Sequence, residues 1–406
     1  MANSVDFVVV GAGVFGASTA YHLARRFPVK RVILVDRKRP NPCAASSDYN
    51  KIIRADYKDK LYTELGLEAL QLWKKDELFK PYFHQCGLLC VEEIGVGRGA
   101  LEHFAALGHD SGAVLMALDE ARNRFPHFQD ADWTGACEAY FNPESGWAEA
   151  DGALRSVIDA AVEAGVEFLE ANVTSLAIND DFSCKGINII DKEGAIERTI
   201  LAVDQTILCV GAYTAKLLAD TSPDWAELQV NGRMIAAAAV QCAASYPQEE
   251  EHKFSGAPCH FLGMWHTHGE SIPPYNGHLK FNCEVSFTNL VHHEGLNESI
   301  SVPPSAETQN TFSQDVPEGL KQEAQNVVKK VFGKYIARLQ IESYRMCWDA
   351  VSPNQDWIID HHPNCNKLLV AGAGSFHAWK FLPTIGKYVV QRMLGDLDDD
   401  KAQKWA

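Results

Sequence analysis

Residues 6–16, DFVVVGAGVFG, join an apolar run to three glycines at the spacing Gly-x-Gly-x-x-Gly. In this pattern the first glycine allows a tight turn from a strand into a helix, and the second lets backbone amides approach a pyrophosphate. The third glycine lets the helix pack closely against the strand. The stretch therefore predicts a dinucleotide site. Its predicted binding residues are Gly11, Gly13, Val14, Phe15 and Gly16.

The segments that follow complete the context that this motif needs. Residues 17–27 have the pattern of a helix, residues 31–35 that of a second buried strand, and Asp36 stands at the end of that strand. An acidic residue about 20 positions beyond the glycines hydrogen-bonds a ribose hydroxyl in such units. Asp36 is therefore a predicted cofactor ligand, and its charge argues against a 2′-phosphate. The alternative is a glycine-rich turn in some other parallel sheet.

Composition limits the partners of this chain. Its 406 residues are 46% hydrophobic, which is enough for two cores and predicts two or three domains. The formal net charge of −16 disfavours nucleic acid and anionic membranes as partners. The sequence has no apolar run of membrane-spanning length, and a strand pattern stands where a secretory leader would be, so we expect a cytoplasmic protein. The eleven cysteines have no CxxC spacing and predict neither a disulfide framework nor a zinc ribbon.

Changes of pattern along the chain predict a domain that the chain leaves and enters again. We assign residues 1–85, 146–222 and 341–406 to a discontinuous nucleotide-binding domain, and residues 86–145 and 223–340 to a second domain on an antiparallel sheet. A cavity between two such layers is a usual place for a small-molecule site. The expected helices cover 61–74, 151–164 and 383–394. The expected strands cover 82–91, 167–169, 173–178, 205–212 and 367–371.

Four stretches carry a resemblance to a known family. They are the glycine-rich start, SDYNKIIR at 47–54, HLKFNCE at 278–284, and residues 344–386. With them the chain resembles the FAD-dependent amine oxidases of the D-amino-acid oxidase superfamily, especially monomeric sarcosine oxidase and the fungal fructosyl amino acid oxidases (amadoriases). The resemblance covers most of the chain. It implies an α/β fold with a Rossmann-like FAD-binding domain and a second α+β substrate domain, FAD as cofactor, and a monomer.

The resemblance places Cys347 where the family attaches its flavin through a thioether. Such a bond needs an accessible thiolate, and Arg345 nearby is expected to lower the pKa of the thiol. The alternative for Cys347 is a buried core cysteine, which is a common fate of this residue type. The other cofactor contacts that the resemblance implies are Ser47, Lys51, Val173, Gly211, Ser375, His377 and Lys380.

Further cations match catalytic positions of the family. The resemblance implies that Lys280 activates oxygen, because a fixed positive charge in a dry cavity stabilises the anion that forms as O2 is reduced. It implies Lys51 as a second charge near the flavin. Arg54 and Lys380 match the two cations that hold the substrate carboxylate. The alternatives are a solvated surface position for Lys280 or Lys380 and a structural ion pair for Arg54.

Glu284 matches an acid that contacts the sugar of the substrate in the amadoriases. It stands four residues after Lys280, and even spacing on a strand would place both side chains on one face. Glu284 is equally expected as an ion-pair partner of Lys280. The adjacent His361 and His362 would face opposite sides of a strand, and we expect no metal.

The chain departs from the family in the stretch Ser-Gly-His-Gly-Phe-Lys, which here reads SFHAWK at 375–380. Two glycines are replaced, so Phe376 is expected to reshape the pocket. The sequence also ends at Ala406, before a segment that supplies a sugar-contacting arginine in the amadoriases. We therefore expect a substrate other than a fructosyl amino acid. A wall of Phe376, Trp379 and Trp348 would suit an aromatic or apolar amine.

The expected activity is oxidation of a secondary, N-alkyl or N-methyl, amino acid to an imine, with O2 reduced to H2O2. One alternative is an oxidase of the pipecolate or saccharopine type, and another is a fructosyl amino acid oxidase. A third is a flavin dehydrogenase that passes electrons to a carrier protein. The last is a non-catalytic nucleotide-binding protein, because a fold alone does not define a function.

Overall fold

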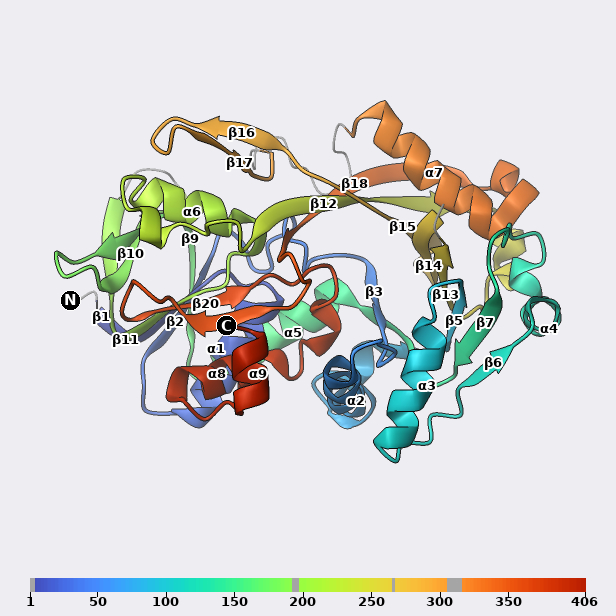
Figure 1. Ribbon diagram of the computed structural model, residues 1–406, viewed down its shortest axis with the longest axis horizontal. Coiled ribbons are helices and arrows are strands. Elements are labelled where there is room, and N and C mark those ends of the chain that lie inside the picture. The colour runs from blue at the N-terminus through green and yellow to red at the C-terminus, as the bar shows by residue number, and fades with distance from the viewer. Residues whose placement is uncertain (1–3, 192–196, 265–266, 305–315) are drawn as a thin grey trace.

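The computed structural model describes residues 4–191, 197–264, 267–304 and 316–406 and is built on two large β-sheets (Figure 1). The first sheet has seven strands. In sheet order they are β1 (Ser4–Val10), β2 (Val32–Asp36), β9 (Glu167–Ile178), β10 (Cys184–Asp191), β11 (Glu197–Leu208), β20 (Leu368–Gly372) and β19 (Ile358–His361). Strand β1 also pairs with β11, and the pairs β1–β2, β1–β11 and β11–β20 are parallel. Because helices cover both faces, the central strands are continuous apolar runs such as residues 7–10.

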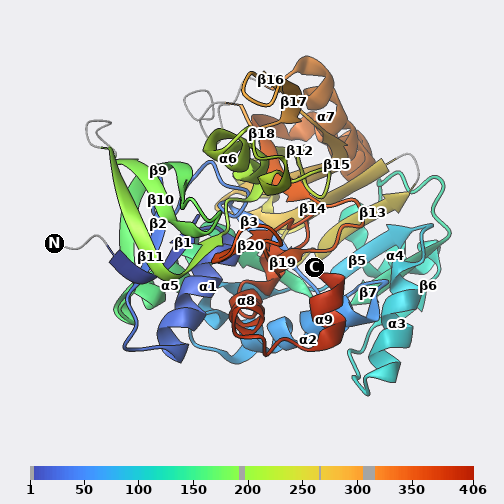
Figure 2. The ribbon, with the colours of Figure 1, turned by 60° about the vertical axis from the view of Figure 1, so that its left-hand side comes forward.

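Helices shield this sheet on both sides. Figure 2 shows α1 (Val14–Arg26), α5 (Ala150–Glu163) and α8 (Ile385–Leu394) on one side and α6 (Thr214–Thr221) on the other. Helix α1 contacts both α5 and α8, and its side chains Ala17, Ala20 and Leu23 are completely buried. These small and apolar side chains recur at helical spacing, which allows the helices to pack closely.

The second sheet has eight strands. In sheet order they are β18 (Gln340–Val351), β12 (Ile235–Ser245), β15 (His278–Phe287), β14 (Thr267–Tyr275), β13 (Cys259–Met264), β5 (Leu88–Glu92), β7 (Glu138–Asn142) and β6 (Val114–Met116). Its neighbours pair antiparallel, apart from the parallel pair β13–β5. Helix α7 (Glu318–Phe332) covers one face and packs Val327 and Val331 into the core of this sheet. The opposite face is turned toward the first sheet.

The remaining elements are short. A three-stranded sheet contains β3 (Asn50–Ile53), β8 (Gly146–Glu149) and β4 (Phe83–Gln85), and a hairpin contains β16 (Leu290–His293) and β17 (Glu298–Ser301). The other helices are α2 (Lys60–Lys75), α3 (Val96–Ala106), α4 (Leu118–Arg124) and α9 (Asp399–Lys404). Short 3₁₀ helices cover Lys80–Tyr82, Pro126–Phe128, Gly211–Tyr213, Ala226–Leu228, Gln248–Lys253, Gly333–Arg338 and Trp379–Phe381. None of the helices in the described ranges has both the length and the apolar character needed to cross a membrane.

The predicted fold class is confirmed, because a mixed nucleotide-type sheet with parallel pairs around β1 stands beside a mainly antiparallel sheet. Three strand predictions were wrong in detail. Of residues 205–212, only 205–208 belong to a strand, β11, and Gly211–Tyr213 form a 3₁₀ turn. Residues 82–91 form two strands, β4 and β5, because Gly87 between them has a positive φ of 84°. Residues 167–169 and 173–178 are parts of the single strand β9.

The predicted division into domains stays a prediction. Residues 341–351, which we grouped with the nucleotide-binding domain, pair along β12 as the edge strand β18 of the eight-stranded sheet. Residues 265–266 and 305–315 of the predicted second domain, and residues 1–3 and 192–196 of the predicted nucleotide-binding domain, lie outside the described residues.

Candidate functional site

A cavity of about 1010 Å³ lies between the two large sheets and is lined from both. It extends from the glycine-rich turn after β1 to the side chains of β14 and β15. Pockets for small molecules usually measure about 300–1,000 Å³, so this volume suits a large ligand. The described residues contain no group of three or more His, Cys, Asp and Glu side chains placed to hold a metal ion.

The glycine-rich turn forms one end of this cavity. Gly11, Gly13, Val14 and Phe15 line it, and the backbone N–H of Val14 donates to Ser46 Oγ at 2.9 Å. Gly16 lies behind the turn, where an added Cβ would stand only 1.7 Å from the carbonyl oxygen of Gly11. The backbone therefore has the close approach of helix and strand that a pyrophosphate site requires.

Asp36 lies beside this turn, as predicted. Its Oδ2 accepts a hydrogen bond from the N–H of Ala12 at 2.7 Å, and its Oδ1 accepts one from Asn41 Nδ2 at 3.0 Å. Burial raises the pKa of this carboxyl, while these hydrogen bonds act in the opposite direction. Val173 and Gly211, two further predicted cofactor contacts, line the same part of the cavity. The glycines, the acid and the volume together fit FAD.

A buried cluster of charges lies beneath the cavity wall. The Asp48 carboxylate is fully buried and contacts Lys280 Nζ at 2.5 Å, Lys51 Nζ at 3.2 Å and the Arg345 guanidinium at 3.8 Å. Burial alone would raise the pKa of Asp48, but the three positive charges outweigh it and hold that pKa well below its usual range. Asp48 belongs to the sequence stretch 47–54, but nothing in that stretch indicated that its carboxylate pairs with three cations.

Lys280 is buried, with 3% of its surface exposed, and also donates to the backbone oxygen of Asn50 at 2.8 Å. Burial lowers the pKa of Lys280 to about 8, against the attraction of Asp48. Lys51 lines the cavity, whereas Lys280 stands behind its surface. Lys280 therefore does not occupy the solvated surface position that was its alternative. Glu284 is not its ion-pair partner either, because Asp48 has that place.

Two cations face the cavity close to the aromatic ring of Tyr57. The guanidinium of Arg54 lies 4.6 Å from the ring centre, and Lys380 Nζ donates to the Tyr57 hydroxyl at 3.0 Å and to the His377 carbonyl at 2.9 Å. Burial, together with the charge of Arg54, lowers the pKa of Lys380. Lys380 is buried rather than on the surface. Two adjacent positive groups in a cavity wall favour an anionic ligand group.

Asp56 anchors the segment that carries Arg54. Its buried carboxylate accepts hydrogen bonds from the Tyr140 hydroxyl, from Asn142 Nδ2 at 2.8 Å and from Ser145 Oγ at 3.0 Å. The backbone oxygen of Asp56 accepts a hydrogen bond from Arg54 Nη1. Sequence reasoning missed this residue, because its partners lie on strand β7 and in the loop that follows it, far away in the chain.

Polar side chains of β14 and β15 form the far wall. Glu270, Asn282 and Glu284 all line the cavity, and Asn282 Nδ2 donates to Glu270 Oε2 at 2.8 Å. The Glu284 side chain is 39% exposed to the open cavity, and reduced solvation there together with the nearby charge of Glu270 raises the pKa of its carboxyl to about 8. His268 Nδ1 is 3.9 Å from the Glu284 carboxylate. Of these residues only Glu284 was predicted, because Glu270 becomes its neighbour only through the register of β14 and β15.

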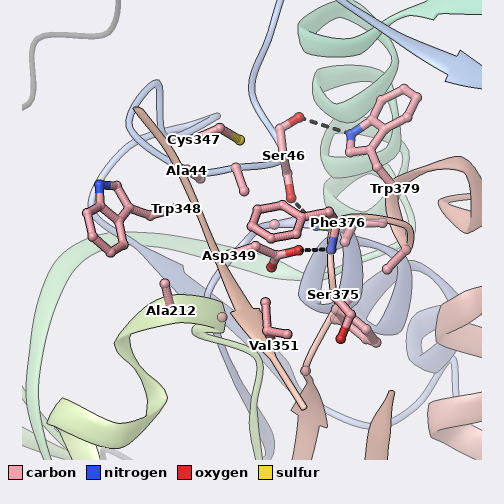
Figure 3. Close-up of a pocket in the computed structure, with 18 of the residues that line it drawn as sticks. Ala44, Ser46, Ala212, Cys347, Trp348, Asp349, Val351, Ser375, Phe376 and Trp379 are labelled. Atoms are coloured by element: carbon pink, nitrogen blue, oxygen red, sulfur yellow. Dashed lines mark hydrogen bonds between the residues drawn. The ribbon is translucent and has the colours of Figure 1, made fainter. Parts of the chain in front are cut away.

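Cys347 lies on β18 with its sulfur directed into the cavity, toward the segment that carries Ala44 and Ser46 (Figure 3). Asp349 points to the same side of the strand, and Trp348 points to the opposite side, toward Ala212. This alternation is the ordinary geometry of a strand. The position is one from which a thiol can reach a ligand in the cavity.

Arg345 stands two residues before Cys347 and holds the segment opposite it. Its guanidinium donates to the carbonyl oxygens of Ser47 at 2.6 Å and Ala44 at 2.7 Å. Its expected effect on the Cys347 thiol stays a prediction. Ser46 lines the cavity, whereas the predicted contact Ser47 does not, although the Ser47 hydroxyl is buried without a hydrogen-bond partner in the described structure.

The segment that departs from the family pattern has an unusual backbone. Ala373, Ser375 and Phe376 have positive φ values of 54°, 47° and 61°. Asp349 Oδ2 accepts a hydrogen bond from the N–H of Phe376 at 2.8 Å and so holds this turn (Figure 3). His377 also lines the cavity, and burial lowers its pKa to about 3.

The three aromatic residues expected to form one wall all line the cavity, but their rings make different contacts. Phe376 lines the cavity and is 42% exposed. Trp379 is buried, donates from Nε1 to the Ser46 oxygen at 3.0 Å and stacks on Trp73 with ring centres 5.5 Å apart. The Trp348 ring packs against Phe287 on the other side of β18. Of these three aromatic residues only Phe376 is exposed, and the far wall of the cavity is polar.

The glycine-rich turn, the acid after β2 and the cavity between the sheets define a flavin-dependent oxidoreductase. Residues 6–392 match the family described as FAD dependent oxidoreductase (DAO), and the chain belongs to this family. The predicted family, the FAD dependence and the class of enzyme are thereby confirmed. The roles predicted for single site residues stay predictions.

Relatives align over nearly the whole chain. L-saccharopine oxidase of Schizosaccharomyces pombe is 26% identical, over 99% of this chain and 93% of the relative. A monomeric sarcosine oxidase from Bacillus sp. is 23% identical, over 97% and 93%. The structure of a modified fructosyl peptide oxidase from Aspergillus nidulans has a TM-score of 0.84 at 26% identity, over 99% and 93%.

Proposed function

We propose that this protein is an oxidase of secondary amino acids that converts the C–N bond next to the substrate carboxylate to an imine and reduces O2 to H2O2. The observation that carries the proposal is the pair of cations Arg54 and Lys380 in the same cavity as the glycine-rich turn. We also propose that the enzyme acts as a monomer on a small molecule.

Arg54 and Lys380 would bind the substrate carboxylate. A guanidinium forms two parallel hydrogen bonds with a carboxylate, which fixes the neighbouring carbon in one orientation. The Tyr57 hydroxyl keeps Lys380 Nζ in place through their 3.0 Å contact. An amino acid held in this way presents its nitrogen and the adjacent C–H bond toward the rest of the cavity.

The substrate nitrogen must be neutral, because its lone pair has to be available as the C–H bond breaks. Positive charges disfavour a further cation nearby, so Arg54, Lys51 and Lys380 would lower the pKa of the substrate ammonium. When bound, FAD supplies the two-electron acceptor. Cys347 is the residue that we propose to carry it covalently, because its sulfur is directed into the cavity.

Lys280 would assist the reaction of oxygen. Negative charge develops on O2 as it is reduced, and a positive charge fixed in a water-poor site stabilises it without reorganisation. Asp48 and the Asn50 carbonyl hold Lys280 Nζ in one position. This arrangement supports an oxidase rather than a dehydrogenase.

The far wall favours a substrate with a polar N-substituent. Glu270 and the Oδ1 atom of Asn282 are hydrogen-bond acceptors, the protonated Glu284 carboxyl can both accept and donate, and Asn282 Oδ1 is buried without a partner in the described structure. Acceptors of this kind fit donors such as an ammonium or hydroxyl groups better than an aromatic ring. The second candidate is thus a saccharopine-type oxidase. Saccharopine oxidase of S. pombe, aligned over 99% of this chain, supports it.

A panel of N-substituted glycines tests this proposal. Substrates are mixed with the purified enzyme without oxygen, and bleaching of the flavin is followed; N-aminopentylglycine and N-hexylglycine have side chains of matched length. We expect both to bleach the flavin and the first to have the lower KM. Release of one H2O2 per turnover in air would exclude the dehydrogenase. If no amine bleached the flavin, the proposed oxidase would be contradicted and a non-catalytic nucleotide-binding protein would be favoured instead.

The proposed covalent bond has its own test. The intact mass of the denatured protein is expected to exceed that of the polypeptide by one FAD, and Cys347→Ser is expected to release the cofactor on denaturation. A bare polypeptide mass for the wild-type protein would contradict the bond. Cys43→Ser, another cysteine of the cavity wall, is the matched control.

A further inference from the structure

Two thiols outside the flavin cavity are in contact. Cys86 lies between β4 and β5, and Cys259 is the first residue of β13. Their sulfur atoms are 3.9 Å apart, although the residues are 173 positions apart in the chain. Cys86 is partly exposed and Cys259 is buried. The proposed oxidase reaction uses neither of them.

The backbone fixes this contact. Strand β13 runs parallel to β5 with Cys259 opposite Leu88, and the N–H of Cys259 donates to the Gly87 oxygen at 3.0 Å. Gly87 has a positive φ of 84°, and a Cβ there would stand 2.5 Å from the ring of Phe141. Only glycine fits this bend, and the bend brings Cys86 next to Cys259.

The two thiols differ in the way that thiol–disulfide chemistry requires. The hydrogen bond from Cys259 lowers the pKa of the Cys86 thiol. Burial raises the pKa of Cys259 well above its ordinary value, and so does its neighbour Cys86. Cys86 is therefore the thiol that ionises, which makes it the nucleophile. Cys259 stays protonated beside it until the second step.

We propose that Cys86 and Cys259 form a peroxide-sensitive dithiol that closes to a disulfide. The Cys86 sulfur attacks one oxygen of H2O2; an S–O bond forms, the O–O bond breaks, and the first water leaves. The Cys259 sulfur then attacks the sulfenic acid; the S–S bond forms, the S–O bond breaks, and the second water takes up the Cys259 proton. The two thiols lose two electrons in all, and one peroxide becomes two waters.

The geometry needs little change for this step. The sulfurs must approach from 3.9 Å to the roughly 2 Å of a disulfide, which side-chain rotation can supply. The new bond would join the segment after β4 to β13, and Phe261 of β13 lines the flavin cavity. The identification of H2O2 as the natural oxidant rests on the proposed function. The Cys86–Cys259 thiol pair does not depend on that function.

The test uses the complete enzyme and added H2O2. We expect non-reducing peptide mapping to find a Cys86–Cys259 linkage, with two thiols lost per chain and a higher Tm. Cys259→Ser is expected to accumulate sulfenic acid at Cys86, which dimedone labels, while the wild-type protein is labelled there much less. Cys137→Ser removes an exposed lone thiol and is expected to leave the linkage unchanged.

The outcomes separate this proposal from the proposed oxidase activity. A linkage formed by added H2O2 supports the dithiol even when no amine is turned over. Turnover with and without catalase then shows whether the enzyme's own peroxide suffices. The proposal is overturned if peroxide oxidises Cys137 while Cys86 and Cys259 stay reduced in the wild-type protein, a result that requires no variant to fold.

Discussion

The nucleotide end and the substrate end of the cavity are built in different ways. The glycine turn and the acid of the nucleotide end come from one continuous stretch, residues 6–36, and act through backbone geometry and a single carboxylate. The substrate end combines Arg54, Lys280 and Lys380, which lie far apart in the chain and are held by buried partners. A local motif can therefore specify the first, whereas the second depends on the whole fold and on single buried charges.

The largest effect is expected from a substitution in the glycine-rich turn of the nucleotide end. Gly16→Ala places a Cβ against the Gly11 carbonyl, so helix α1 must shift from β1. We expect the free energy of unfolding to fall by about 3 kcal/mol or more, with loss of FAD. Chemical denaturation and the flavin content measure both. Gly319→Ala, where the added atom meets open space, is expected to change stability by less than about 0.5 kcal/mol.

Removing one buried charge tests the substrate end. Lys280→Met is expected to slow reoxidation of the reduced enzyme by O2 by a factor of about 10², because the charge that stabilises the developing anion is lost. Reduction by substrate without oxygen is expected to change much less. Stopped-flow measurement of the two half-reactions separates them, and equal slowing of both would contradict the role of Lys280.

The same lysine gives a pH dependence. The pKa of Lys280 is lowered to about 8, so its positive charge is present below that pH and is lost as the pH rises through it. The rate of reoxidation is therefore expected to fall above about pH 8. Lys280→Arg keeps its charge at higher pH and is expected to remove this fall. A wild-type profile that is flat from pH 7 to 10 would refute the assignment.

A smaller effect on substrate binding is expected from a change at Asp56, which holds the segment that carries Arg54. Asp56→Asn weakens the hydrogen bonds from Tyr140 and Ser145 and loosens the segment of Arg54. We expect KM for a carboxylate substrate to rise roughly tenfold with a smaller change in kcat. Asp132→Asn breaks an exposed ion pair with Lys330 and serves as the control, with an effect below about 1 kcal/mol on stability and none on KM.

The raised pKa of Glu284, a residue of the polar far wall, is expected to make the stability of the protein depend on pH. Its pKa is about 8 in the folded protein against an ordinary 4.5, so the folded state keeps a proton that the unfolded chain releases. The resulting stabilisation is complete below pH 4.5 and is lost as the pH rises through about 8. Tm of the wild-type protein is expected to decline over this range relative to Glu284→Gln. Parallel Tm curves for the two proteins would disprove the shift.

The smallest effect concerns the segment that departs from the family. Phe376→Gly relieves a φ of +61° but gives the unfolded chain more freedom, so we expect stability to change by less than about 1 kcal/mol. The loss of an exposed ring from the cavity is expected to admit bulkier N-substituents. KM values across a series of N-alkylglycines measure this, and an unchanged series would place the ring outside the substrate site.

The sequence predicted the nucleotide end well because its residues act through local backbone geometry. Helix α1 begins at Val14, earlier than the apolar pattern suggested, because the glycine turn itself starts the helix. The substrate end was predicted only through resemblance. Glu270 meets Asn282 through the register of two strands, and Asp56 meets Tyr140 across the fold, and neither relation leaves a periodic signal in the chain.

The most direct test of the proposed function compares one secondary amino acid with its methyl ester. N-aminopentylglycine and its ester are each mixed with the enzyme without oxygen, and bleaching of the flavin is recorded. Because Arg54 and Lys380 are proposed to hold a carboxylate, the acid is expected to bleach the flavin and the ester to do so at least about tenfold less efficiently. Equal bleaching by both, or bleaching by neither, would contradict the proposal.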